Sequence, residues 1–223
     1  KYWLSQGITS AYSFTMDGSE MRAYQELCAE DSLPLRIKAM FCELTNSSDS
    51  LDNLIYLGIQ SNLGNEWLSL GGVKIFVDGA FMTLTSASKE PYINIPGESE
   101  YSGVLRIDHD TLNEWVLKAH NAGLTLCVHA MGDKAQEYAL DAYENALTEN
   151  PRAHRHRIEH FGCDMGSPDI RKRAKDLGII PNVTSGWLYS YGDFMEKHLG
   201  PERSRQSFAW RTLIDEGFDL ADS

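Results

Sequence analysis

Two histidines stand where two predicted strands end, and their spacing indicates a site that binds a ligand. The stretch Leu124–His160 reads LTLCVHAMGDKAQEYALDAYENALTENPRAHRHRIEH. One apolar run ends at His129, a turn and a helix-period segment follow, and a second short run ends at His160. Parallel strands joined by a helix point the same way. Both imidazoles should therefore lie at the carboxyl ends of the strands, where α/β folds bind ligands, and a pair of imidazoles suits a divalent metal of the zinc type.

A simpler interpretation exists for each histidine taken alone, because a histidine at a strand end often just hydrogen-bonds a neighbouring carbonyl. Two of them follow their strands directly in consecutive strand–helix units. That repetition favours a metal-binding or catalytic pair over two unrelated structural histidines.

Lys74 lies inside the apolar strand VKIFV, and lysine is rarely buried without a reason. It is a metal ligand if its amine is carboxylated by carbon dioxide, since the carbamate would bridge two metals. It is a Schiff-base nucleophile if its pKa is lowered. It has no chemical role if it extends outward to solvent. The two predicted strand-end histidines favour the first interpretation slightly over the third and strongly over the second.

The elements that must position these side chains alternate between strand and helix. Strand patterns occupy 8–14, 35–41, 73–77, 124–128, 157–159, 179–184 and 218–221, and helix patterns occupy 19–31, 51–57, 110–121, 134–147, 170–177 and 204–216. The spacing is roughly 30 residues per unit, as in a (β/α)₈ barrel of the TIM type. We expect a single α/β barrel domain over residues 1–223. We expect it to be incomplete, with strand 1 missing and strand 8 cut short, as a fragment of a longer protein.

Several side chains near the predicted site have more ordinary roles. Asp133 is expected to cap the helix from Lys134. Glu159 should face away from His160 and be structural. His154 and His156 precede their strand and are expected on or near the surface.

Three longer segments have no single clear pattern. Residues 80–103 contain several prolines and glycines and form either a lid over the site or a surface connection. Residues 185–201 are expected to be an aromatic loop with short helical pieces. The run of Lys and Arg in 171–175 is expected to be a solvated helix face.

Composition excludes some partners. The chain has 223 residues, 42% of them hydrophobic, and a formal net charge of −12. An acidic chain disfavours nucleic acid and an anionic membrane surface as partners. Its four cysteines form no C-x-x-C pair, which fits reduced thiols in the cytoplasm. No apolar run approaches the ~18–20 residues that span a bilayer.

The segments VKIFVDG, VHAMGDKA and RHRIEH, in this order, resemble the amidohydrolase superfamily, in particular its metal-dependent branch that includes the N-substituted formamide deformylases. The resemblance implies a barrel with a metal centre at the carboxyl ends of the strands. Lys74 then matches the family's lysine, which is often carboxylated, and His129 and His160 match its next two ligands. The family's His-x-His has no counterpart in this chain. Its catalytic Asp is expected just beyond Ser223, or is Asp222 if the register slips.

Two departures from the family pattern concern the substrate. Residues 80–84 read AFMTL where the family often has a stretch ending in arginine, and residues 182–187 read NVTSGW where Gln-Pro is commoner. A substrate-facing arginine is therefore expected to be absent.

The resemblance implies a metal-dependent hydrolase that cleaves a non-peptide amide or related C–N bond of a small molecule with a metal-activated water. One or two divalent ions are expected, zinc by preference. The fragment alone should be inactive, and its open strand edges favour a homo-oligomer. The alternatives are a non-catalytic barrel that binds a small molecule or regulates, and a Schiff-base lyase that uses Lys74.

Overall fold

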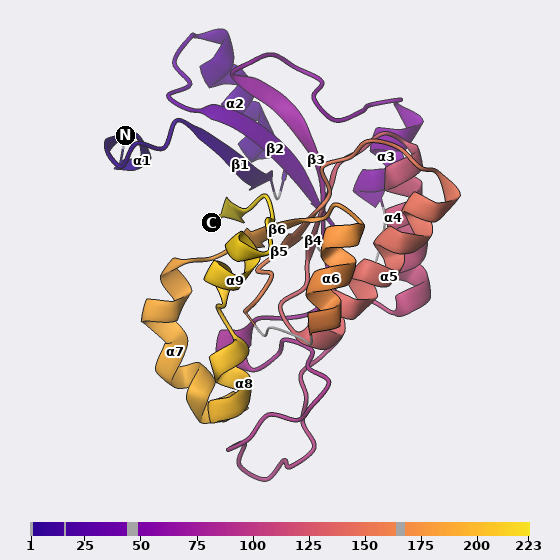
Figure 1. Ribbon diagram of the computed structural model, residues 1–223. Helices are drawn as coiled ribbons and strands as arrows, with labels where there is room; N and C mark the ends of the chain where they lie inside the picture. Colours follow the sequence, from indigo (N-terminus) through magenta and orange to yellow (C-terminus); the bar gives the residue numbers. More distant parts are fainter. Residues whose placement is uncertain (1, 16, 44–48, 164–167) are drawn as a thin grey trace. The chain divides into compact units, whose positions relative to one another are not determined.

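The computed structural model describes residues 2–15, 17–43, 49–163 and 168–223, in which strands and helices alternate (Figure 1). Contacts divide the chain into two compact units. The first unit comprises the residues up to Ile75 together with Lys118–Leu126, and the second comprises Phe76–Leu117 and Cys127–Ser223. The expectation of one domain over 1–223 stays a prediction.

The first unit contains parallel strands covered by helices. β1 (Ser10–Thr15) pairs with β2 (Arg36–Glu43), and β2 pairs with β3 (Leu68–Phe76), both in parallel. The helices are α1 (Tyr2–Ser5), α2 (Gly18–Ala29) and α3 (Asp49–Tyr56). Part of its core consists of three buried side chains, Leu33, Ile37 and Leu68. Partly buried residues of α2 and of neighbouring segments pack against them: Ala11, Met21, Tyr24, Cys28 and Leu35.

A bulge in β3 lies three residues before the predicted ligand Lys74. Leu70 pairs with Ala39 and Gly72 with Met40, so Gly71 is an extra residue in β3. Gly72 has a φ of 146°, and a Cβ there would overlap the carbonyl oxygen of Thr125. That carbonyl accepts a hydrogen bond of 2.9 Å from the Val73 N–H. The close approach of the two backbones therefore requires glycine at position 72.

Gly72→Ala should destabilise the protein by about 1–3 kcal/mol from backbone strain alone, with the overlap on Thr125 added. Gly71→Ala is the matched control, because a Cβ there first meets the flexible side chain of Met40. Urea unfolding of both variants measures the difference. Equal stability of the two variants would contradict the close approach at Gly72.

The second unit also contains parallel strands. β4 (Leu126–His129), whose first residue belongs to the first unit, pairs with β5 (Arg157–Glu159), β5 with β6 (Ile180–Val183), and β6 with β7 (Ala221–Asp222). The Val77 N–H also donates to the His129 carbonyl at 3.0 Å. The other elements are η1 (Phe81–Thr83), α5 (Asp133–Glu149), α6 (Pro168–Asp176), α7 (Gly186–Leu199), α8 (Pro201–Gln206) and α9 (Trp210–Asp215). Helix α4 (His109–Asn121) begins in the second unit and ends in the first.

The seven predicted strands and the parallel α/β class are confirmed, with boundaries that differ by a few residues. The incomplete (β/α)₈ barrel, with its first strand missing and its eighth strand cut short, stays a prediction. A polar loop is also expected from the sequence at 46–50, and its part up to residue 48 lies outside the described residues.

Two predictions about the C-terminal third are wrong. Residues 185–201 are not a loop with short helical pieces, because α7 is one helix of 14 residues. The predicted helix 204–216 is two helices, α8 and α9, separated where Phe208 adopts a φ of 56°. The reason is tertiary packing. Buried residues of this region join residues from the preceding loops in one hydrophobic cluster: Phe81, Tyr92, Met131, Cys163, Met195, Leu199 and Phe208.

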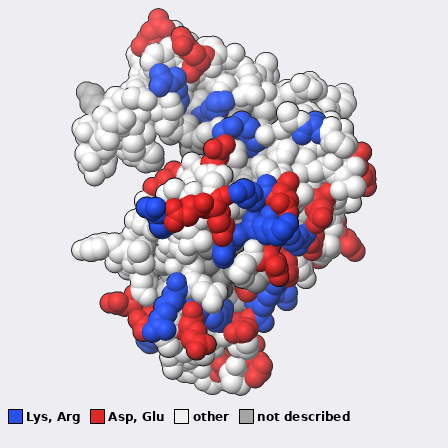
Figure 2. Space-filling view, in the orientation of Figure 1, with Lys and Arg blue, Asp and Glu red and all other residues white. Residues whose placement is uncertain are grey.

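The basic run on α6 is a solvated, ion-paired face, as predicted. Figure 2 shows Lys and Arg gathered over α6 with Asp and Glu beside them. Arg173 contacts Asp141 at 2.7 Å and Glu144 at 2.6 Å. Each ion pair of this kind contributes little to stability, so the face is explained by solvation.

Among the described residues, no helix is both long and apolar enough to cross a membrane.

Candidate metal centre

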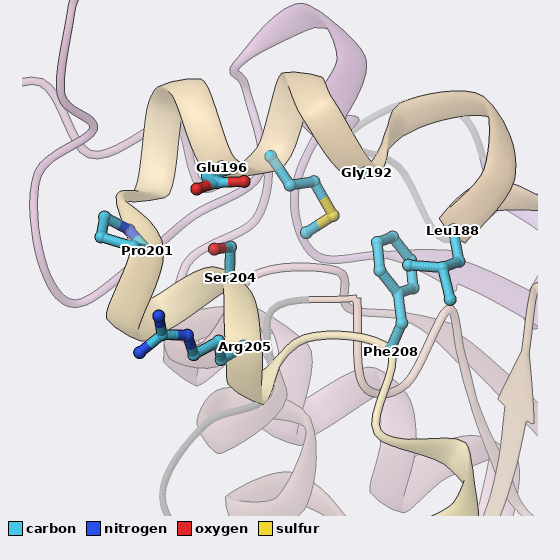
Figure 3. A pocket seen from close by; sticks show the side chains of 8 residues that line it. Leu188, Gly192, Glu196, Pro201, Ser204, Arg205 and Phe208 are labelled. Carbon is cyan, nitrogen blue, oxygen red and sulfur yellow. The ribbon is translucent and has the colours of Figure 1, made fainter.

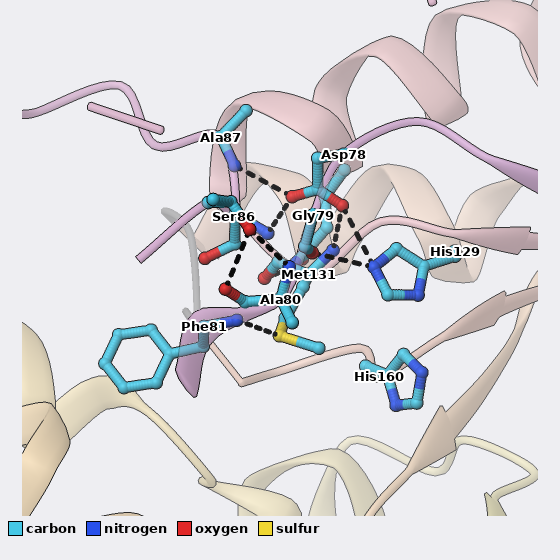
Figure 4. Close-up of polar contacts among 12 residues, drawn as sticks. Asp78, Gly79, Ala80, Phe81, Ser86, Ala87, His129, Met131 and His160 are labelled. Carbon is cyan, nitrogen blue, oxygen red and sulfur yellow. Dashed lines mark hydrogen bonds and ion pairs between the residues drawn. The ribbon is translucent and has the colours of Figure 1, made fainter. Parts of the chain in front are cut away.

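His129 ends β4, and its imidazole is almost fully buried. In Figure 4 the ring is turned toward Asp78 and Gly79. Its Nε2 lies 2.9 Å from the Gly79 carbonyl oxygen and 3.3 Å from Oδ1 of Asp78. The Gly79 carbonyl can only accept a hydrogen bond, so Nε2 carries the proton. Nδ1 is then the nitrogen with a lone pair for a metal.

His160 follows β5 and is held from two sides. Its Nδ1 lies 3.1 Å from Oγ1 of Thr184, and that hydroxyl lies 3.1 Å from Oγ of Ser223. Its ring stacks on the indole of Trp187 with centroids 4.9 Å apart and an interplanar angle of 14°. Its backbone has a φ of 62°, which is uncommon for a residue other than glycine and occurs often at functional sites.

The structure brings the two imidazoles together. The ring centroids of His129 and His160 are 4.9 Å apart and the rings are inclined at 71°. Their strands pair in parallel, with His129 opposite Glu159, so the two histidines leave the sheet at the same edge. The role of the pair as metal ligands stays a prediction.

Lys74 belongs to the first unit, where its side chain is 1% exposed. Its Nζ lies 4.3 Å from the centroid of the Phe14 ring. The interpretation in which Lys74 extends outward to solvent is therefore wrong, and its carboxylation and Schiff-base alternatives stay open. Over the described ranges, no three side chains drawn from His, Cys, Asp and Glu are grouped as a metal site. Lysine is not among those residue types, so this absence does not test a set of two histidines and a lysine.

Asp222, the catalytic residue expected if the register slips, lies in β7 and has a structural contact. Its Oδ1 accepts a hydrogen bond of 2.8 Å from the Ser185 N–H, and its Oδ2 accepts one of 2.6 Å from the Ser185 hydroxyl. The carboxylate thus holds the residue from which α7 starts. Ser223, and not Asp222, is linked through Thr184 to His160.

Asp78 is the main residue of this site that sequence reasoning left without a role. It is completely buried. Its Oδ1 accepts from the N–H of Met131 at 3.0 Å, and its Oδ2 accepts from Gly132 at 2.9 Å and from Ala87 at 2.8 Å. The available signal was an aspartate directly after the buried strand VKIFV, where a charged side chain needs partners.

The segment 80–103 is part of the packed structure around Asp78. Residues 86–88 and Tyr92 are buried, so for them the interpretation as a surface connection is wrong. The Ala87 carbonyl accepts hydrogen bonds from the N–H groups of Lys134 and Ala135 at 3.2 and 3.3 Å. These are among the first N–H groups of α5, which no helical carbonyl can satisfy.

Two expectations about neighbouring residues are corrected. Asp133 does not cap α5, since the helix already begins at Asp133 and Gly132 is the N-cap. The Asp133 carboxylate instead accepts a hydrogen bond from the Lys89 N–H at 2.8 Å. His156 is completely buried rather than near the surface, and it stacks on Tyr143 with centroids 5.3 Å apart.

Glu159 is structural, as predicted. It is completely buried and accepts a hydrogen bond of 2.9 Å from Nε of Arg157 and another from the side-chain amide of Asn182. Tyr143 completes the cluster by donating its hydroxyl to the Arg157 carbonyl at 2.8 Å. Burial raises the pKa of Tyr143 well above its usual value, so it stays a neutral donor.

Glu159→Gln should lower the free energy of unfolding by about 3–5 kcal/mol, because the buried Arg157 would lose its counter-charge. Glu144→Gln, which removes an exposed partner of Arg173, should change it by less than about 1 kcal/mol. Urea unfolding at neutral pH measures both. Similar losses in the two variants would show that the Arg157 pair is not effectively buried.

A pocket in the second unit lies between α7 and α8 and has a volume of about 270 Å³ (Figure 3). Its floor includes the buried residues Met195 and Phe208, and Glu196 and Arg205 line it from opposite helices. None of the predicted metal ligands lines this pocket, so it is not the metal centre.

The sequence pattern of the Amidohydrolase family matches residues 2–221. This chain therefore belongs to the amidohydrolase family, and the resemblance inferred from VKIFVDG, VHAMGDKA and RHRIEH is confirmed.

Three comparisons illustrate the relationship. Protein LONG AFTER FAR-RED 3 of Arabidopsis thaliana is 31% identical over 232 residues, covering 99% of this chain and 38% of the relative. N-substituted formamide deformylase of Arthrobacter pascens is 26% identical, covering 96% of this chain and 39% of the relative. The crystal structure of an uncharacterized metal-dependent hydrolase from Pyrococcus furiosus superposes with a TM-score of 0.84 at 28% identity, over 100% of this chain and 43% of that one. The chain thus spans about two fifths of the length of these relatives.

Proposed function

We propose that the protein to which this chain belongs is a metal-dependent hydrolase that cleaves a non-peptide amide or related C–N bond of a small molecule. The observation that carries the proposal is the contact between the His129 and His160 imidazoles, 4.9 Å between centroids, at the ends of adjacent parallel strands. Membership of the amidohydrolase family supports hydrolysis. The Pyrococcus furiosus hydrolase supports a metal, and the Arthrobacter pascens deformylase supports a C–N bond as the target.

The donor set fits a divalent ion of the zinc type. The ring of His129 uses Nε2 for the Gly79 carbonyl, and the ring of His160 uses Nδ1 for Thr184. The opposite nitrogens, Nδ1 of His129 and Nε2 of His160, are therefore the atoms that we assign to the metal. Metal-binding histidines usually hold their second nitrogen in such a hydrogen bond, which fixes the tautomer and the ring orientation. Lys74, carboxylated on Nζ, is the third ligand that we propose.

A bound divalent ion lowers the pKa of a water ligand and polarises a substrate carbonyl, the two effects that amide hydrolysis requires. The residues of this chain orient the ligands and shape the site. Trp187 covers one face of the His160 ring and keeps water from it. We assign proton transfer to the leaving nitrogen to an aspartate, and Asp222 is the candidate within this chain.

Metal content tests the proposal directly. Plasma mass spectrometry of the purified protein should find one to two zinc ions per chain, and His129→Asn should lower this sharply because a ligand nitrogen is lost. His109→Asn is the matched control, since His109 is a half-buried histidine that pairs with Asp141 and is not a predicted ligand. Its metal content should equal that of the wild type.

The outcomes separate the alternatives. No metal in the wild type even after zinc is supplied would overturn the hydrolase proposal. In that case trapping with borohydride and a carbonyl substrate would identify a Schiff-base lyase, because only an imine at Lys74 leaves a reduced adduct. A metal content that falls in His129→Asn and not in His109→Asn would justify a screen of small amides, including N-substituted formamides.

A further inference from the structure

We propose that Asp78 positions His129 for metal binding by fixing the orientation of its imidazole and, together with the Gly79 carbonyl, its tautomer. This inference rests on the function proposed above, because it assigns His129 a metal. Asp78 is a positioning residue, since its carboxylate contacts the ligand histidine and not the metal.

The first argument is the sharing of one carboxylate oxygen. Oδ1 of Asp78 lies 3.0 Å from the Met131 backbone nitrogen and 3.3 Å from Nε2 of His129 (Figure 4). Met131 is two residues after His129 along the chain. The same oxygen thus holds the imidazole and the turn that directly follows it. A half-turn of the ring would place a carbon where Nε2 now faces Asp78 and Gly79, and both contacts would be lost.

The second argument is that the carboxylate itself has no freedom to move. Its other oxygen accepts from the N–H groups of Gly132 and Ala87, which come from the turn before α5 and from the segment 80–103. A Cβ at Gly132 would overlap the Ala87 carbonyl, so these two segments are in close backbone contact. The position of Oδ1 beside His129 is therefore set by three backbone groups.

The third argument is that an amide cannot replace this carboxylate. The described hydrogen bonds to Asp78 all come from backbone N–H groups, those of Ala87, Met131 and Gly132. Nε2 of His129, whose proton goes to the Gly79 carbonyl, lies 3.3 Å from Oδ1. If the amide nitrogen of Asp78→Asn takes the place of Oδ1, it opposes the Met131 N–H and lies beside the Nε2–H of His129. If it takes the place of Oδ2, it opposes the Gly132 and Ala87 N–H groups. Either arrangement leaves at least one backbone N–H facing another donor.

A purely structural Asp78 would stabilise the turn without affecting the histidine. The two cases differ in zinc affinity and in the tautomer of His129. Glu159→Gln is the matched control, because Glu159 is an equally buried carboxylate whose described side-chain partners are Arg157 and Asn182 and not His129.

The experiment compares wild type, Asp78→Asn and Glu159→Gln in the purified protein. Zinc affinity is measured by competition with a chromophoric chelator, and the His129 tautomer in the metal-free protein by ¹⁵N NMR. We expect Asp78→Asn to bind zinc about 10–100-fold more weakly, as is typical when a partner of a metal-bound histidine is lost. It should also lose the uniform Nε2–H tautomer, because a ring that Asp78 no longer holds in place also leaves the Gly79 carbonyl. Glu159→Gln should keep the wild-type affinity and tautomer although it lowers stability.

Unchanged affinity and tautomer in Asp78→Asn would overturn the inference and leave the proposed function standing. Absence of zinc from the wild type would instead overturn the function, while the tautomer of the metal-free protein would still test Asp78. If Asp78→Asn does not fold, a measurement on the wild-type protein tests the inference instead. Its His129 Hε2 proton should show a nuclear Overhauser effect to the Met131 amide proton, because Nε2 and the Met131 nitrogen lie 3.3 and 3.0 Å from the same oxygen of Asp78, and its absence would overturn the inference.

Discussion

The hydrogen bonding of the Asp78 carboxylate is the interaction on which the candidate metal centre depends. A completely buried carboxylate is costly unless several donors satisfy it. Here the donors are the backbone N–H groups of Ala87, Met131 and Gly132, and the ring of His129 lies against the same carboxylate at 3.3 Å. The end of β3, the segment that follows it and the turn after β4 are therefore joined at one point. A ligand side chain placed at such a point has little freedom, as precise ligand binding requires.

The second histidine is positioned differently. His160 has the left-handed backbone conformation, which costs of order 1–3 kcal/mol and persists only when its surroundings hold it. The stacked indole of Trp187 and the hydroxyl of Thr184 provide those contacts. Both come from the end of β6 and the start of α7, so the helix that sequence patterns did not predict is also the element that holds His160. A fixed Asp–His contact and a strained, stacked histidine together make a site whose two rings meet at 4.9 Å.

Much of this arrangement could be predicted from local sequence patterns. The strands are continuous apolar runs bounded by turn residues, because a parallel strand is buried on both faces. Once two strands are parallel, the residues directly after them must lie at the same edge of the sheet. That rule predicts that His129 and His160 lie together, as their rings do, and the family resemblance carried by the same motifs is confirmed. The burial of Lys74 followed from its place inside an apolar strand.

Other features depend on residues that are far apart in the chain, and local sequence patterns do not predict them. The aromatic segment 185–201 became one helix because its buried face packs against distant residues such as Phe81 and Tyr92. The role of Asp78 depends on backbone N–H groups up to 54 positions away. The sequence by itself therefore determined the order of strands and helices and the two histidines at their ends, because these depend on periodicity and strand direction. Only the tertiary structure decided which nitrogen of each ring is held and by which group, because hydrogen bonds between distant segments leave no periodic trace in the sequence.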